Sequence, residues 1–180
     1  MLKTDRLLLH PLTADQLAKY IKNDGSLEKE LGIDASETIL SADLKHALQK
    51  DVLPAVSDTT KDYHFSTLWI IISRAEHKII GDICFVGEPK SDGETEIGYK
   101  TMEAFRNKGY MTEAVSAIIT WAIDNPKVHS IFATTEKANT ASCAILEKNR
   151  FQKIGETEAM FHWRLMTIEE SKKMTEGTFN

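Results

Sequence analysis

The chain has 180 residues, 42% of them hydrophobic and 27% charged, and a formal net charge of −5 at pH 7. This length and composition predict one globular domain over residues 1–180, and the negative charge argues against bulk attraction to nucleic acid or anionic membrane. The charged N-terminus lacks the apolar core of a signal peptide, and no apolar run reaches membrane-spanning length. Cys84 and Cys143 lie far apart in the sequence, which favours free buried thiols. We therefore expect a soluble cytoplasmic protein that binds neither nucleic acid nor membrane.

The first sixty residues are predicted to hold one strand followed by helices. Residues 6–10 form a short apolar strand, which a proline ends. Thr13 then caps a helix with one apolar face, and a short helix over residues 27–33 follows. A third helical stretch begins at Ser41, and Pro54 is expected to disturb its end.

From residue 65 onward the pattern changes to strands that alternate with helices. Apolar, β-branched runs separated by short polar turns predict a three-strand antiparallel meander, followed by a helix, a strand, a second helix and a closing hairpin. A meander followed by a βαβ unit predicts a mixed α/β (α+β) fold with a central sheet flanked by helices. The expected strands cover residues 65–73, 78–86, 95–100, 130–134, 151–156 and 159–166, and residues 167–180 form a tail of helical propensity.

The most informative stretch is a basic loop between a strand and a helix. The loop Arg106-Asn107-Lys108-Gly109-Tyr110-Met111 precedes a strongly periodic helix that begins at Thr112. The N-terminus of a helix presents unpaired N–H groups and a positive dipole end, so such a loop binds anions, most often phosphate. The alternative is an ordinary exposed basic turn that leads into a packed helix. The usual nucleotide signatures, G-x-G-x-x-G and G-x-x-x-x-G-K-[ST], are absent from the sequence.

Two motifs together resemble the GNAT N-acetyltransferase superfamily. The run Glu96-Ile97-Gly98-Tyr99, with residues 106–114, resembles the acetyl-CoA motif of that family, Q/R-x-x-G-x-G/A at a strand-to-helix junction. The run Asn139-Thr140-Ala141-Ser142, with residues 146–151, resembles its second motif, N-x-x-S…L-E-K-x-G-F. The opening residues 6–12 resemble the branch that holds ribosomal-protein N-terminal acetyltransferases. The resemblance covers a core over residues 6–166 and implies the GNAT fold, whose central sheet is mixed and mostly antiparallel.

Three positions depart from the family pattern. Met111 replaces the second small residue of the acetyl-CoA motif. Arg150 replaces the glycine before Phe151, and because a left-handed non-glycine residue costs about 1 kcal/mol, we expect Asn149 to take that conformation instead. Leu146 stands where many members carry a tyrosine that protonates the leaving thiolate.

The resemblance implies acetyl-CoA as the acetyl-donor cosubstrate, held by backbone and side-chain groups of both motifs. The loop would bind the pyrophosphate, the strand end would pair with the pantetheine, and Asn139 would donate a hydrogen bond to it. Gly98 interrupts a strand, which predicts either a bulge and close backbone approach or a simple twist-relieving glycine. The implied cofactor-binding residues are Tyr99, Lys100, Thr101, Met102, Arg106, Asn107, Lys108, Gly109, Tyr110, Met111, Thr112, Asn139 and Ser142.

Two residues are expected to be catalytic. Glu96 is the candidate general base, acting through a water molecule, and the alternative is a solvated or structural carboxylate. Glu136 is the reserve candidate for the base. Ser142 is the candidate proton donor to the sulfur, and the alternative is a helix serine that bonds to its own backbone.

The expected activity is acetyl transfer from acetyl-CoA to an amine acceptor, either a protein N-terminus or a small-molecule amine, by direct attack in a ternary complex. The alternative is a non-catalytic, regulatory GNAT module that binds acyl-CoA. The six histidines show no metal-binding spacing, so no metal site is expected. The sequence does not select a monomer or a homodimer, and it does not select one amine acceptor.

Overall fold

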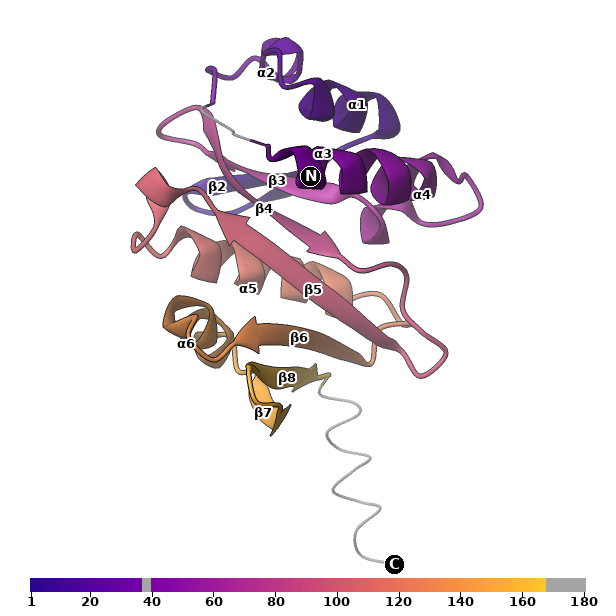
Figure 1. Ribbon diagram of the computed structural model, residues 1–180, viewed down its shortest axis with the longest axis vertical. Coiled ribbons are helices and arrows are strands. Elements are labelled where there is room, and N and C mark those ends of the chain that lie inside the picture. Colours follow the sequence, from indigo (N-terminus) through magenta and orange to yellow (C-terminus); the bar gives the residue numbers. More distant parts are fainter. Residues whose placement is uncertain (37–39, 168–180) are drawn as a thin grey trace, which may run out of the picture.

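The computed structural model describes residues 1–36 and 40–167 as an eight-stranded sheet in the order β1-β2-β3-β4-β5-β6-β8-β7, with helices on both faces (Figure 1). The strands are β1 Leu2–Lys3, β2 Leu7–Pro11, β3 Leu68–Ser73, β4 Lys78–Phe85, β5 Glu94–Thr101, β6 Ser130–Glu136, β7 Gln152–Glu156 and β8 Met160–Met166. The helices are α1 Ala14–Lys22, α2 Ser26–Leu31, α3 Ala42–Ala47, α4 Leu53–Ser57, α5 Tyr110–Ile123 and α6 Thr140–Lys148. The predicted helical tail lies outside the described residues, apart from Thr167.

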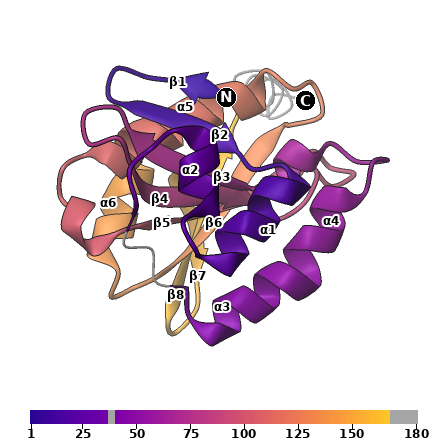
Figure 2. The ribbon, with the colours of Figure 1, turned by 90° about the horizontal axis from the view of Figure 1, so that it is seen from above.

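The sheet has an apolar core on each of its faces. Helices α5 and α6 cover one face, and α1, α2, α3 and α4 cover the other, which Figure 2 shows as two separate groups of helices. Strand β3 explains the continuous apolar run in the sequence, because Trp69 and Ile71 face the first core while Ile70 and Ile72 face the second. The prediction of a mixed, mostly antiparallel sheet flanked by helices is confirmed.

Strands β5 and β6 are the one parallel pair of the described sheet, and they separate soon after they begin to pair. Their ladder joins residues 94–96 to residues 130–132. Beyond that point β5 continues to pair with β4 as far as Thr101, while β6 continues to pair with β8 as far as Glu136. The two strands therefore open a V in the middle of the sheet, and the edge of β5 that faces β6 carries unpaired backbone groups there.

The bulge expected as one alternative at Gly98 is not present in the described ladder. The register of β4 and β5 runs without a shift from Gly81 and Thr101 to Phe85 and Ile97, and Gly98 pairs with Cys84 inside it. The irregularity of the meander lies instead between β3 and β4, at Ile71 and Ile72. The separation of β5 from β6 thus needs no bulge, because β5 follows β4 while β6 follows β8.

The local signals for helix ends are confirmed at three of the caps. The hydroxyls of Thr13 and Ser41 accept hydrogen bonds from the first turns of α1 and α3, and the Asn139 side chain caps α6. The disturbance expected at Pro54 is confirmed, since α3 gives way to a π-helical turn at residues 48–52 that leads directly into α4. Pro54 follows this turn, in the first turn of α4, and it has no N–H to continue the regular helical ladder.

The expectation for the turn after α6 is wrong. Arg150 has a φ of 66° and is the left-handed residue, whereas Asn149 is the C-cap with a φ of −92°. The Asn149 side chain explains the difference, because its amide donates hydrogen bonds to the carbonyl oxygens of Thr112 and Ile145 at 3.3 and 2.9 Å. These bonds tie the end of α6 to the first turn of α5 and hold Asn149 in a right-handed conformation.

Candidate active site

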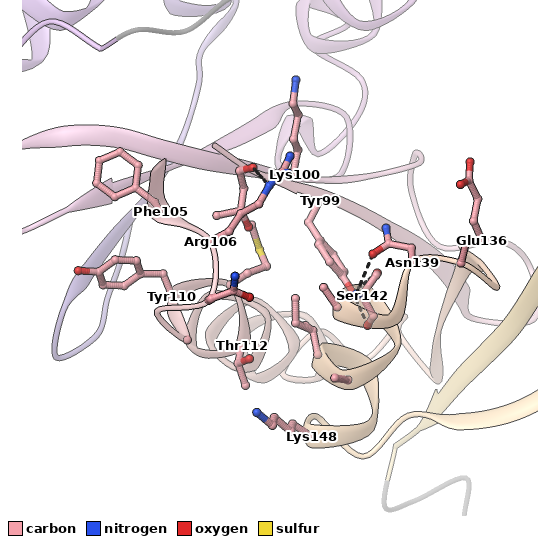
Figure 3. Close-up of a pocket in the computed structure, with 18 residues that line it drawn as sticks. Tyr99, Lys100, Phe105, Arg106, Tyr110, Thr112, Glu136, Asn139, Ser142 and Lys148 are labelled. Atoms are coloured by element: carbon pink, nitrogen blue, oxygen red, sulfur yellow. Dashed lines mark hydrogen bonds between the residues drawn. The ribbon is translucent and has the colours of Figure 1, made fainter. Parts of the chain in front are cut away.

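A cavity of about 680 Å³ lies between the end of β5, the loop after it, and the helices α5 and α6 (Figure 3). The cavity brings the two sequence motifs together, because one wall comes from residues 99–112 and the other from residues 136–148. Of the implied cofactor-binding residues, only Met102 and Lys108 lie outside its lining. Met102 packs toward the core under α1–α4, and the Lys108 ammonium lies 5.1 Å from the centre of the Phe105 ring.

The N-terminus of α5 opens onto this cavity. Gly109 is the N-cap with a φ of 75°, and among the described residues no side chain caps this end of the helix. Gly109, Tyr110, Met111 and Thr112 all line the cavity. A positive φ requires glycine or a strained residue, so Gly109 allows the chain to turn sharply into the helix. The first-turn N–H groups are thereby left to a ligand, which is the arrangement that binds phosphate.

The N-terminal segment braces this loop from the side of the sheet. The Arg6 guanidinium forms an ion pair with Glu113 at 2.6 Å, donates to the carbonyl oxygen of Lys108 at 3.0 Å, and lies 4.7 Å from the centre of the Tyr110 ring. The Thr4 hydroxyl donates to Glu113 at 2.6 Å. Burial alone would raise the pKa of Glu113, but the hydrogen bonds from Thr4 and Arg6 lower it. The loop conformation therefore depends on contacts with residues about a hundred positions earlier.

The two walls of the cavity touch through a pair of hydroxyl groups. The Tyr99 hydroxyl on β5 lies 2.8 Å from the Ser142 Oγ on α6, and the Ser142 backbone N–H donates to Asn139 Oδ1 at 3.1 Å (Figure 3). Burial raises the pKa of Tyr99 to about 12, so its phenol stays protonated at physiological pH. Leu146, at the position where many family members carry tyrosine, is fully buried in the core.

A second cavity, of about 350 Å³, occupies the V between β5 and β6. It extends toward Thr134 on β6 and Met160 on β8. The residues that line both cavities are Tyr99, Glu136, Asn139 and Ser142. Two ligands that entered from different sides would therefore meet beside these four residues.

The two candidate bases occupy different places. Glu136 lines both cavities, at the end of β6. Glu96 lies outside both, half-buried at the last paired position of β5 with β6, where its side chain is on the opposite face from Tyr99. That face belongs to the core under α1–α4, and Cys84 lies nearby on it, with a pKa raised to about 11 chiefly by burial and further by the carboxylates of Asp82 and Glu96.

The sequence matches a protein family over most of its length. A profile for the acetyltransferase (GNAT) domain matches residues 6–152. The chain belongs to the GNAT acetyltransferase family. A relative from Bacillus subtilis (strain 168), described as an uncharacterized N-acetyltransferase YjdG, is 31% identical over 169 residues and covers 93% of this chain and 98% of its own length. The chain is thus an acyltransferase of the GNAT family.

Solved structures with the same fold include two ribosomal-protein acetyltransferases. The ribosomal-protein-S5-alanine acetyltransferase from Vibrio fischeri has a TM-score of 0.70 at 17% identity and covers 93% of this chain and 97% of its own. A ribosomal L7/L12 α-N-protein acetyltransferase in complex with coenzyme A has a TM-score of 0.64 at 14% identity and covers 91% and 95%. These similarities establish the shared fold of the GNAT domain.

A half-buried carboxylate lies on the other face of this GNAT sheet. Asp82 on β4 pairs directly across from Lys100 on β5, and no hydrogen bond to its carboxylate is found among the described residues. Burial raises the pKa of Asp82 to about 6, against a smaller lowering by the Lys100 ammonium. Its charge also contributes to raising the pKa of Tyr20 on α1, which places Asp82 under that helix.

Within residues 1–36 and 40–167, no helix is both long and apolar enough to cross a bilayer. In the same part of the chain, no group of three or more His, Cys, Asp or Glu side chains is placed to hold a metal ion. Both cysteines of the GNAT domain are free thiols.

The sequence missed the contacts that join distant segments. Arg6 and Glu113 stand in the sequence only as members of the resembling runs 6–12 and 106–114, and no pattern points to Thr4. The contact between Tyr99 and Ser142 is likewise not predicted. A local pattern carries no signal for such pairings, because 43 residues separate Tyr99 from Ser142 and 107 separate Arg6 from Glu113.

Proposed function

We propose that this GNAT domain transfers an acetyl group from acetyl-CoA to an amine by direct attack in a ternary complex. The observation that carries the proposal is the cavity that follows the free edge of β5 and ends at the uncapped N-terminus of α5. A second cavity shares Ser142 and three other lining residues with it and offers space for the acceptor. Two adjoining cavities suit a reaction in which both substrates are bound together.

The chain offers groups for each part of the donor. The first-turn N–H groups of α5 and the Arg106 guanidinium suit the two charges of a pyrophosphate. The backbone from Tyr99 to Thr101, which has lost its β6 partner, suits the amide groups of a pantetheine arm. Asn139, whose Oδ1 already accepts from Ser142, keeps its amide N–H₂ for the same arm.

The chemical step needs a base for the amine and a proton for the sulfur. The neutral amine nitrogen attacks the carbonyl carbon of the thioester, the C–S bond breaks, and the sulfur leaves with the bonding electrons. We assign Ser142 the donation of a hydroxyl proton to the sulfur, which its position in the lining of both cavities supports. Glu96 remains our predicted base, which would act through water from the α1–α4 face. Glu136 is its rival, since it lines both cavities.

For the acceptor we propose a protein N-terminal amine ahead of a small-molecule amine. What supports this order is the shared fold, because two of the structural neighbours are described as ribosomal-protein acetyltransferases. Asp82 and Glu96, both half-buried on the α1–α4 side of the sheet, are carboxylates that would suit a cationic amine. The two free thiols are in keeping with a reducing cytoplasm, where we place the enzyme.

The test is an acceptor screen with purified protein. Acetyl-CoA is mixed with peptides that carry free N-termini, with polyamines and with aminoglycosides, and both thiol release and acetylated products are measured, the latter by mass spectrometry. We expect transfer to at least one class, in amounts equal to the thiol released. Tight binding of acetyl-CoA with no transfer to any amine would instead support the non-catalytic acyl-CoA-binding module.

A further inference from the structure

The Tyr99 hydroxyl on β5 and the Ser142 hydroxyl on α6 form a contact between the two walls of the cavity. The Tyr99 ring packs against the core under α5 and α6, and only its hydroxyl reaches α6. That hydroxyl lies 2.8 Å from the Ser142 Oγ and 3.3 Å from the Ser142 carbonyl oxygen. Both residues line both cavities, at the place where the reacting groups would meet (Figure 3).

We propose that Tyr99 is a positioning residue that holds the Ser142 hydroxyl and directs its proton toward the sulfur of the leaving coenzyme. The proposal rests on the proposed function, because it assigns Tyr99 to the proton-donating step of that reaction. In this role the Tyr99 phenol on β5 hydrogen-bonds Ser142 on α6 from the opposite wall of the cavity.

The direction of the hydrogen bond follows from the chemistry of the two groups. A phenol is a much stronger acid than an aliphatic alcohol, so we assign the Tyr99 O–H as the donor to Ser142 Oγ at 2.8 Å, with the Ser142 carbonyl oxygen as its longer second acceptor at 3.3 Å. Since burial keeps the phenol protonated, this donor is present throughout the physiological pH range. The serine then keeps its own proton for a second acceptor in the cavity, and accepting a hydrogen bond makes that proton more acidic.

The backbone of Ser142 is held as firmly as its side chain. Asn139 Oδ1 accepts the Ser142 N–H at 3.1 Å, and Asn139 is the N-cap that starts α6. The serine is therefore fixed between the cap below it and the Tyr99 phenol beside it. As the C–S bond breaks, the Ser142 proton moves to the sulfur and the Tyr99 hydrogen bond stabilises the charge that grows on Oγ. Water then carries the proton lost by the acceptor nitrogen to the serine, so that the products are the amide and the free thiol.

The Tyr99–Ser142 pair would take the place of the α6 tyrosine that the family resemblance implies and this chain lacks. Leu146 occupies the α6 position at which the family resemblance would put a tyrosine, and it is fully buried. A hydroxyl from β5 therefore reaches the same region through Ser142. The expected consequence is that removal of either hydroxyl damages the same step.

The test compares Y99F, S142A and the double variant Y99F/S142A with the wild-type protein, using an amine acceptor from the screen. We expect kcat to fall by about 100-fold in S142A and about 10-fold in Y99F, with the KM for acetyl-CoA nearly unchanged. The double variant should be no slower than S142A, because Tyr99 acts only through the serine. Y63F, on the turn before β3, is the matched control and should keep wild-type kcat.

A second readout separates positioning from a general loss of folded protein. An acetyl donor in which selenium replaces the thioester sulfur releases a selenolate that needs no proton at neutral pH. The ratio of rates with the two donors is independent of the fraction folded, and the Y99F defect should nearly vanish with selenium. An equal defect with both donors, or independent losses in the double variant, would overturn the role of Tyr99. If the wild-type protein transfers acetyl to no amine at all, the proposed function itself fails.

Discussion

The half-buried Asp82 carboxylate gives a stability prediction that does not depend on any substrate. In the folded chain the pKa of Asp82 rises from 3.8 to about 6, because burial disfavours the charged form more than Lys100 favours it. Since one pKa unit corresponds to about 1.4 kcal/mol, ionised Asp82 destabilises the fold by about 3 kcal/mol at neutral pH. Replacement of Asp82 by asparagine, which removes the charge and keeps the shape, should restore up to that amount.

The sign of the pH dependence follows from proton binding. Between pH 4 and 6 the folded state binds more protons at Asp82 than the unfolded state does, so the contribution of this residue to the free energy of unfolding falls as pH rises. The wild-type protein and D82N should therefore be equally stable near pH 4, and D82N should be more stable by about 2–3 kcal/mol above pH 7.

Urea unfolding of both proteins at half-unit steps from pH 4 to 8 measures this difference directly. D124N, which changes an exposed carboxylate at the end of α5, is the control and should follow the wild-type curve. A difference between wild-type and D82N that stays constant with pH would refute the argument, because it would show that Asp82 has the same pKa in both states.

Two further predictions concern the loop and the base. E113Q removes the charged partner of Arg6, so the loop before α5 should lose its brace and the Kd for acetyl-CoA should rise about tenfold by calorimetry. E30Q, the control, breaks the exposed ion pair with Lys19 between α1 and α2 and should leave the Kd for acetyl-CoA unchanged. An equal effect of both variants would contradict the role of the Arg6–Glu113 ion pair in holding the loop. Because Glu96 is the predicted general base, E96Q should lower kcat about 100-fold and remove the acidic limb of the pH–rate profile. Retention of that limb by E96Q would assign the base elsewhere, and E136Q tests the rival Glu136 in the same way.

The sequence predicted the cavity well because its two walls are local motifs. Residues 106–112 form a loop followed by a helix, and residues 139–142 form a cap followed by a helix, so backbone chemistry alone places their N–H groups. The parallel pairing of β5 and β6 then brings the two motifs side by side. Nearly all the implied cofactor-binding residues therefore line one cavity.

The residues that the sequence left open or mispredicted depend on contacts between distant segments. Of the two alternatives for Gly98 the bulge is absent, and the opening between β5 and β6 arises from the different partners of these strands. Arg150, and not Asn149, adopts the left-handed conformation because the Asn149 amide is bonded to α5. The partner of Tyr99 depends in the same way on how α6 packs over β5, which no local pattern specifies.

Calorimetric titration of acetyl-CoA into a matched pair of glycine variants tests the central claim most directly. Gly109 and Gly25 are both helix N-caps with positive φ, 75° and 80°, but Gly109 lines the cavity and Gly25 precedes α2 with no atom within 4 Å of an added Cβ. G109E and G25E therefore carry the same backbone strain and added charge. If the N-terminus of α5 binds the cofactor, the wild-type protein and G25E should each bind one acetyl-CoA, and G109E should bind none. Unchanged affinity in G109E, or no binding to the wild-type protein, would contradict that claim.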